Sequence, residues 1–133
     1  SQLISGKFPM IPALSFPFVD VRDVAKLHLK AMITPEANGK RFIAAHANPT
    51  WMYEIAEILF NAGYDKIKLK KAPSFILKLI GLIDNQTKSL VPMLDKFVPT
   101  DNSQTVEILK WEPMPLKQAF IEHAKSVTEI KNS

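Results

Sequence analysis

The chain has 133 residues, 47% of them hydrophobic and 23% charged, which is enough for one modest folded domain and too little for two ordinary ones. Its formal net charge is +4, and 15 of its 17 basic residues are lysines, whereas proteins that read nucleic acids depend on arginine for bidentate contacts. The composition therefore argues against a nucleic-acid partner, and the absence of cysteine excludes disulfides and cysteine-ligated metals and fits a cytoplasmic protein.

No targeting or membrane-spanning segment is visible. The longest apolar run, residues 74–83, has ten residues and is interrupted by Lys78, whereas a membrane-spanning helix needs about 20. We therefore expect no membrane partner. The chain begins without a helix cap or start signal, so we expect residues 1–133 to be one region cut from a longer protein.

The first half of the chain alternates between predicted strands and helices. Residues 15–21 are rich in phenylalanine and valine and predict a strand. Residues 20–35 predict a helix, and residues 39–46 a second strand. The stretch of residues 48–63 predicts a helix with Thr50 as its N-cap and Gly63 as its C′ residue. The expected buried stripe of the first helix is Val24, Leu27, His28, Ala31 and Met32, and that of the second is Met52, Ile55, Ala56 and Leu59.

The second half is mostly helical. Residues 66–70 alternate between lysine and aliphatic side chains and predict a third short strand. Four helices are expected after it: residues 72–84 with Pro73 in the first turn, residues 85–97 interrupted at Pro92, a short helix within residues 99–111 capped by Asp101 or Ser103, and residues 114–130. The expected buried stripe of the last helix is Leu116, Ala119, Phe120, His123, Val127 and Ile130. The sequence thus predicts a helix-rich α/β fold with about three short strands and five or six helices.

Tyr64 and Lys68 have the Tyr-x-x-x-Lys spacing that is the catalytic signature of the short-chain dehydrogenase/reductases. In such a site the lysine lies one helical turn from the tyrosine and lowers its pKa. Here the alternating pattern predicts a strand, in which four residues span about 13 Å. We therefore predict that neither residue is catalytic, and that the lysines protect a strand edge from unwanted pairing.

Two longer stretches resemble a known family. The first, residues 16–45, carries the resemblance at Val19, Val21, Asp23, Ala25, His28, Pro35, Ala37, Gly39, Arg41, Phe42 and Ile43. The second, near the C-terminus, carries it at Asp101, Ser103, Leu109, Trp111 and Pro113. Together they resemble the extended short-chain dehydrogenase/reductases, in the branch of dihydroflavonol-reductase-like aldehyde and ketone reductases. The usual glycine before the tryptophan is Lys110 here.

The resemblance implies that residues 1–133 are the C-terminal, substrate-side region of a Rossmann-type NAD(P)H-dependent carbonyl reductase. The four glycines, at positions 6, 39, 63 and 81, are too far apart to form the family's phosphate loop. NAD or NADP would thus bind a nucleotide-binding domain outside this chain, and we expect no catalytic residue and no bound cofactor here. The implied partners are a small carbonyl substrate and that missing domain. The alternative is a non-catalytic member that senses dinucleotides or binds partners.

An apolar, proline-stiffened segment, residues 6–18, supplies the candidate site. By the resemblance it runs near the substrate cleft, so Met10, Ile11, Pro12 and Phe16 are candidates for a hydrophobic pocket wall. Simple core packing of these side chains is an equally good interpretation.

The remaining notable residues have structural interpretations. Asp20 and Asp23 at a helix start fit capping better than acid–base chemistry. The three histidines, His28, His46 and His123, lack the spacing of zinc ligands, and Trp51 and Trp111 fit packing. Residues 74–83 are apolar on almost every face, so they should be buried against a cleft, the nucleotide-binding domain or a second subunit of a homo-oligomer.

Overall fold

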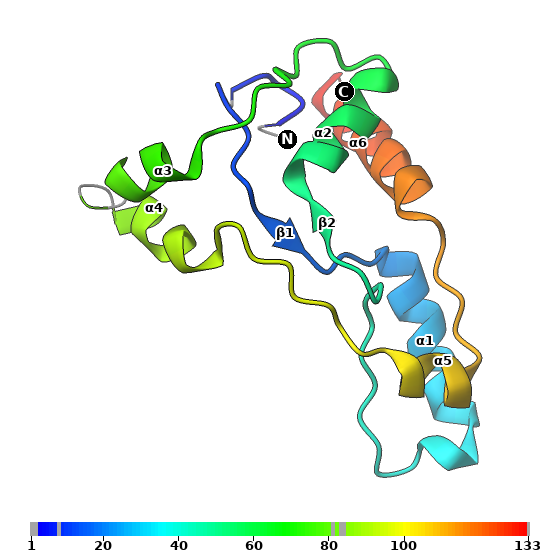
Figure 1. Cartoon of the computed structure of the whole chain (residues 1–133). Helices are drawn as coiled ribbons and strands as arrows, with labels where there is room; N and C mark the ends of the chain where they lie inside the picture. The colour runs from blue at the N-terminus through cyan, green and yellow to red at the C-terminus, as the bar shows by residue number, and fades with distance from the viewer. Residues whose placement is uncertain (1–2, 8, 81, 83–84, 133) are drawn as a thin grey trace.

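The computed structural model describes residues 3–7, 9–80, 82 and 85–132 (Figure 1). Over these residues the fold is helix-rich, as predicted, with six α-helices, two short 3-10 helices and one two-stranded sheet. The helices are α1 (Val21–Ile33), α2 (Met52–Asn61), α3 (Ser74–Ile80), α4 (Asn85–Leu90), α5 (Ser103–Leu109) and α6 (Leu116–Asn132), with the 3-10 helices η1 (Pro35–Ala37) and η2 (Val91–Met93). The break at Pro92 is confirmed, because η2 replaces the α-helix there.

The sheet lies near the middle of the molecule (Figure 1). Its strands, β1 (Ser15–Phe16) and β2 (Thr50–Trp51), run antiparallel, with Ser15 opposite Trp51. The backbone N–H of Met52 also donates to the carbonyl of Leu14 at 2.9 Å. The sheet therefore holds the start of α2 against the segment that precedes β1.

The predicted strands are mostly wrong. Only two residues of the predicted strand 15–21 are in β1, and neither 39–46 nor 66–70 forms a strand, although both segments lie within the described part of the chain. Next to 66–70, a single parallel bridge joins Ile11 and Lys71. Strand β2 was not predicted. A strand needs a neighbouring backbone that supplies its hydrogen bonds, and an alternating pattern does not show whether that neighbour exists.

Ile43, in the second of these segments, shows what replaces the missing strand. Its backbone N–H donates to the hydroxyl of Thr105 at 3.0 Å, and the same hydroxyl donates to the carbonyl of Ile43 at 3.0 Å. Thr105 is buried, so one side chain from α5 satisfies both backbone groups of this residue.

Three groups of elements surround the sheet in Figure 1. Helices α2 and α6 pack side by side at one end, and α1, η1 and α5 form the other end. Helices α3 and α4 with η2 project to a third side, and we name these three elements the arm. The two ends have separate hydrophobic cores.

The first core lies between α2 and α6. Its buried members are Ile11, Ile55, Ala56, Leu59, Ile67 and Ala124. The predicted stripe of α2 is confirmed, since three of its residues are buried here and Met52 packs against them. The stripe of α6 is partly wrong: His123 and Ile130 are exposed, whereas Ala124 is buried. The buried face of α6 centres on Ala119, Phe120 and Ala124, which places His123 at its polar margin.

Helix α2 ends as its sequence predicts. Gly63 has a φ of +99°, which a residue with a side chain rarely adopts. Its N–H donates to the carbonyl of Phe60, and the N–H of Tyr64 donates to the carbonyl of Leu59, which is the hydrogen-bond pattern of a Schellman motif. At the other end Trp51 is the N-cap, one residue later than the predicted Thr50.

The second core contains the buried side chains of Leu27, Ala37, Leu109 and Trp111. The packing role of Trp111 is confirmed: it is 2% exposed, and its indole N–H donates to the carbonyl of Asp23 at 3.2 Å. The predicted stripe of α1 is wrong at His28 and Met32, which are exposed. The buried face of α1 runs through Asp23 and Leu27 instead.

Lys110 ends α5 in the left-handed conformation, with a φ of +47°. It occupies the position at which the resembling family usually has glycine. The conformation costs a residue with a Cβ atom about 1 kcal/mol more than it costs glycine. The carbonyl of Lys110 accepts a hydrogen bond from the ammonium group of Lys30, which ties the end of α5 to α1.

Candidate functional site

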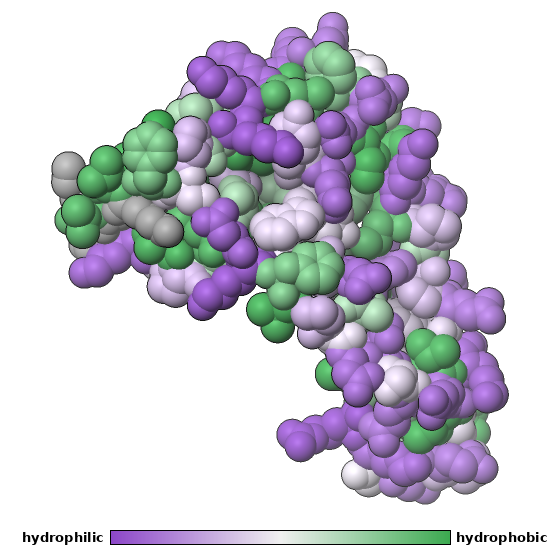
Figure 2. All heavy atoms as spheres, in the orientation of Figure 1, coloured by the Kyte–Doolittle hydropathy of each residue, from purple (hydrophilic) through white to green (hydrophobic). Residues whose placement is uncertain are grey.

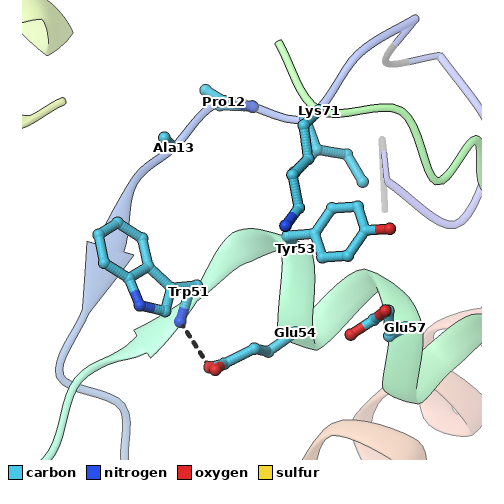
Figure 3. Close-up of a pocket in the computed structure, with 8 residues that line it drawn as sticks. Pro12, Ala13, Trp51, Tyr53, Glu54, Glu57 and Lys71 are labelled. Carbon is cyan, nitrogen blue, oxygen red and sulfur yellow. Dashed lines mark hydrogen bonds between the residues drawn. The ribbon is translucent and has the colours of Figure 1, made fainter. Parts of the chain in front are cut away.

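A groove of about 440 Å³ lies between the segment before β1 and the first turns of α2 (Figure 3). Its lining residues are Ile11, Pro12, Ala13, Trp51, Tyr53, Glu54, Glu57 and Lys71. We name it the Trp51 groove. Its volume lies within the range of pockets that bind small molecules, about 300–1,000 Å³.

Backbone hydrogen bonds hold the walls of the Trp51 groove together. The N–H of Ile11 donates to the carbonyl of Lys70 at 2.7 Å, and the N–H of Ala72 donates to the carbonyl of Ile11 at 2.8 Å. These two bonds bring Lys71 beside the segment that leads into β1. The β1–β2 pairing brings Trp51 to the opposite side, so three distant parts of the chain form one site.

Trp51 and Glu54 are fixed relative to each other at the start of α2. The backbone N–H of Trp51 donates to the carboxylate of Glu54 at 3.0 Å, which also places a negative charge in the first turn of the helix (Figure 3). The indole ring of Trp51 lies 6.0 Å from the ring of Phe97. Trp51 is half-buried, so an aromatic surface remains open to the groove.

Tyr53 and Lys71 form a cation–π pair, with the ammonium nitrogen 4.3 Å from the centroid of the ring. The exposed carboxylate of Glu57 lies one turn further along α2 than Glu54 and borders the same groove (Figure 3). The Trp51 groove thus combines a wall of apolar residues, two aromatic rings and a border that carries both negative and positive charges. Such a surface can bind a small organic molecule with an apolar body and one hydrogen-bonding end.

The structure separates the four residues that the sequence proposed for the pocket. Ile11 and Pro12 line the Trp51 groove, although the side chain of Ile11 is 2% exposed and belongs to the first core. Met10 is half-buried and is not among the residues that line the groove. Phe16 borders a different crevice of about 330 Å³, where Met93 and Lys96 also lie.

The opposite wall of the groove was not predicted from the sequence. Trp51 was assigned to packing, and Tyr53, Glu54 and Glu57 were not considered. One signal was present: Glu54 and Glu57 are three residues apart on the polar side of a predicted helix, which places them on one face. No local signal connects Lys71 with this helix, because their contact depends on the bridge to Ile11.

The aspartates at the start of α1 have structural roles. The carboxylate of Asp20 caps the helix by accepting from the backbone N–H of Arg22 at 2.8 Å, as predicted. The guanidinium of Arg22 bonds Asp20 at 2.8 Å and the carboxylate of Glu122 on α6 at 2.6 Å. The hydrogen bond from the Arg22 side chain lowers the pKa of Asp20 to about 2. Hydrogen bonds from Gln118 and Arg22 lower the pKa of Glu122.

Asp23 is 1% exposed and joins α1 to the segment between α5 and α6. Its carboxylate accepts from the backbone N–H of Met114 at 2.7 Å and from the ammonium of Lys26 at 3.2 Å. Every oxygen of this group faces a donor within the protein, which fits a buried structural acid rather than one that exchanges protons with a substrate.

The histidines do not gather. A ring nitrogen of His28 lies 2.8 Å from the carbonyl of Val24, and one of His46 lies 3.1 Å from the carbonyl of Met114. Among the residues that the structure describes, no group of three or more histidine or acidic side chains could hold a metal ion.

Tyr64 and Lys68 do not lie on a strand, so the strand geometry predicted for them is wrong. The ring of Tyr64 packs against the first core instead, after the Schellman motif of α2. Lys68 is exposed. That neither residue is catalytic stays a prediction, now based on the packing of the tyrosine ring.

One face of α1 is apolar and exposed. Val21, Leu29, Met32 and Ile33 are 79%, 64%, 81% and 80% exposed. Their positions in the sequence differ by eight, three and one. These spacings place them on the side of the helix opposite Leu27. This helix therefore has one apolar face in the second core and another that no described residue covers.

No protein-family model matches the chain, and no curated protein matches it. The resemblance to the extended reductases therefore depends on the sequence motifs alone.

Proposed function

We propose that residues 1–133 form the substrate-side region of an NAD(P)H-dependent reductase of aldehydes or ketones. In this proposal the nucleotide-binding domain and the tyrosine that donates the proton belong to another part of a longer cytoplasmic protein. The carbonyl substrate occupies the Trp51 groove, where the rings of Trp51 and Tyr53 contact its apolar part. No nucleic acid takes part.

The exposed apolar face of α1 carries this proposal. Helix α1 holds several of the residues on which the resemblance depends, and a solvated face with Met32 and Ile33 at 81% and 80% exposure is unfavourable in an isolated domain. A nucleotide-binding domain packed on this face would bury it.

The size of the Trp51 groove supports a small substrate. Its volume of about 440 Å³ accommodates a molecule of roughly metabolite size. Glu57 and Lys71 at its border offer one acceptor and one donor, which can orient a substrate that carries a hydroxyl or a second polar group.

An assay of the longer protein tests the proposal. We expect NADH or NADPH to be oxidised in the presence of aldehydes or ketones, and Trp51→Ala to raise KM at least tenfold with a smaller change in kcat. Phe60→Ala is the matched control, because Phe60 is an exposed aromatic residue of α2 outside the groove. Dinucleotide binding without turnover would instead support the non-catalytic alternative.

Residues 1–133 alone provide a second measurement. We expect no binding of NADH or NADPH by calorimetry, and micromolar binding of either would contradict the proposed division of the protein.

We also expect the isolated chain to self-associate through α1, so that sedimentation gives a dimer or larger species. Leu29→Ser should shift it toward the monomer, and a wild-type monomer at all concentrations would contradict this role of α1.

A further inference from the structure

The positive charge of the chain is concentrated in one segment. Residues 66–96 contain seven lysines, two aspartates and no other charged residue, which gives a formal net charge of +5. The whole chain carries +4, so all other residues together carry −1. The lysines at positions 66, 68, 70, 88 and 96 are exposed. This segment therefore presents most of its positive charge to solvent.

The same segment exposes large apolar side chains on the arm. Phe75 and Leu79 are 64% and 59% exposed and lie four residues apart, on one face of α3. Leu82, just after α3, is 81% exposed. Ile80, Leu90 and Met93 are each at least 40% exposed. Figure 2 shows hydrophobic residues gathered at the projecting end of the molecule, over α3 and α4.

Two hydrogen bonds fix the base of the arm. The hydroxyl of Ser74 donates to the carboxylate of Asp95 at 2.7 Å, which joins the start of α3 to the residue that follows Leu94. The backbone N–H of Asp95 donates to the carbonyl of Ala13 at 2.9 Å. The arm therefore projects from a defined point beside β1 (Figure 1), and its exposed apolar residues lie at the projecting end of the molecule (Figure 2).

We propose that the arm binds the surface of anionic membranes. Phe75, Leu79 and Leu82 enter the boundary between headgroups and acyl chains, and the lysines of residues 66–70 contact lipid phosphates. An apolar run of about ten residues is long enough for an interfacial segment, and no helix among the described residues is long and apolar enough to cross a membrane. Our expectation of no membrane partner was based on the length of a span alone, and this contact needs no span.

Charge and shape favour a membrane over protein partners. A second copy of the chain would bring a second segment of net charge +5 against the first, which is repulsive. An acidic protein with an apolar groove would satisfy the charge, but it would have to enclose a projection. A lipid surface accommodates such a projection without a shaped pocket. This proposal is independent of the reductase activity.

Co-sedimentation with vesicles tests the proposal. We expect the chain to bind vesicles of phosphatidylcholine with 30 mol% phosphatidylglycerol at least tenfold more tightly than vesicles of phosphatidylcholine alone. The binding should weaken at least tenfold between 50 and 500 mM NaCl. The double variant Phe75→Ser, Leu79→Ser and the triple variant Lys66→Glu, Lys68→Glu, Lys70→Glu should each weaken it at least tenfold. Circular dichroism of each variant shows whether it is folded.

The matched control is Ile130→Ser on α6, because Ile130 is 74% exposed and lies outside the charged segment. It should bind as the wild type does. An equal loss for this control, or equal binding to neutral vesicles, would overturn the proposal.

A second experiment locates the contact. Phe75→Trp should show fluorescence quenching by brominated acyl chains beyond the quenching of Trp51 and Trp111 in the wild type. Unchanged quenching would contradict insertion of the arm. Absence of vesicle binding combined with salt-sensitive binding to poly-glutamate would assign the arm to an acidic protein. Absence of vesicle binding combined with a loss of self-association in the Phe75/Leu79 variant would assign it to a second copy. Either result rejects the membrane.

Discussion

The buried carboxylate of Asp23 accepts a hydrogen bond of 2.7 Å from the backbone N–H of Met114, 91 residues further along the chain. We expect Asp23→Ala to lower the free energy of unfolding by about 2–4 kcal/mol, because it leaves that N–H without its charged acceptor. Urea unfolding measures the change. Asp65→Ala, at an exposed acid, should change stability by less than about 0.5 kcal/mol. An equal effect of the two variants would contradict a special role for Asp23.

The pair of Asp20 and Arg22 makes stability depend on pH. The pKa of Asp20 is about 2 in the folded chain, against an ordinary value of 3.8, so the unfolded chain binds more protons between these values. The stabilisation is present above about pH 4 and is lost as the pH falls toward 2. Asp20→Asn keeps a good helix cap but removes the charge. Thermal unfolding should show that this variant is less stable than the wild type at pH 6 and that the difference shrinks toward pH 2. A constant difference over that range would reject the electrostatic explanation.

Lys110→Gly should stabilise the protein by about 0.5–1 kcal/mol, because Lys110 has a φ of +47° and glycine adopts this conformation without a steric cost. The carbonyl that accepts from Lys30 is retained. Lys110→Ala is the control, since it keeps the Cβ atom and should bring no gain. Denaturant unfolding compares the two variants, and a gain for alanine would mean that side-chain charge causes the effect.

Tyr64→Phe should leave the turnover of the longer reductase close to that of the wild type. The ring of Tyr64 packs against the first core, and phenylalanine keeps that packing. Steady-state kinetics test this prediction. Removal of a general acid lowers the rate by about 10²-fold or more. A loss of that size in a folded variant would show that Tyr64 takes part in catalysis.

Features with local signals were predictable from the sequence. The predicted N-cap of α2, Thr50, lies one residue before the observed cap, Trp51, and Gly63 follows the helix as predicted, because caps, glycine and the spacing of Ile55 and Leu59 are read from neighbouring residues. The break at Pro92 was predictable for the same reason, since proline removes a hydrogen-bond donor wherever it occurs.

Strands and the far wall of the site were not predictable, because they depend on residues far apart in the sequence. The backbone of Ile43 bonds Thr105, 62 residues away, and nothing near Ile43 indicates this partner. Ile11 and Pro12, two of the four residues proposed from the sequence, line the groove, but no neighbouring residue indicates Lys71, which a single bridge joins to Ile11. Exposed faces were also misjudged: the apolar pattern of α1 does not show which of its two apolar sides is covered.

The two hydrophobic cores meet at a very short segment. Phe18 packs on the first core and Val19 on the second, so adjacent residues of one extended stretch serve opposite ends of the molecule. Beyond this stretch, the ion pair of Arg22 and Glu122 connects α1 to α6. We therefore expect the chain to open as two cooperative units, one around each core. The unit around the second core contains α1 and α5, and its amide protons should exchange with solvent when that unit opens. The amide protons of α2 and α6, around the first core, should stay protected at that moment. The slowest-exchanging amides will therefore report the stability of the first unit alone.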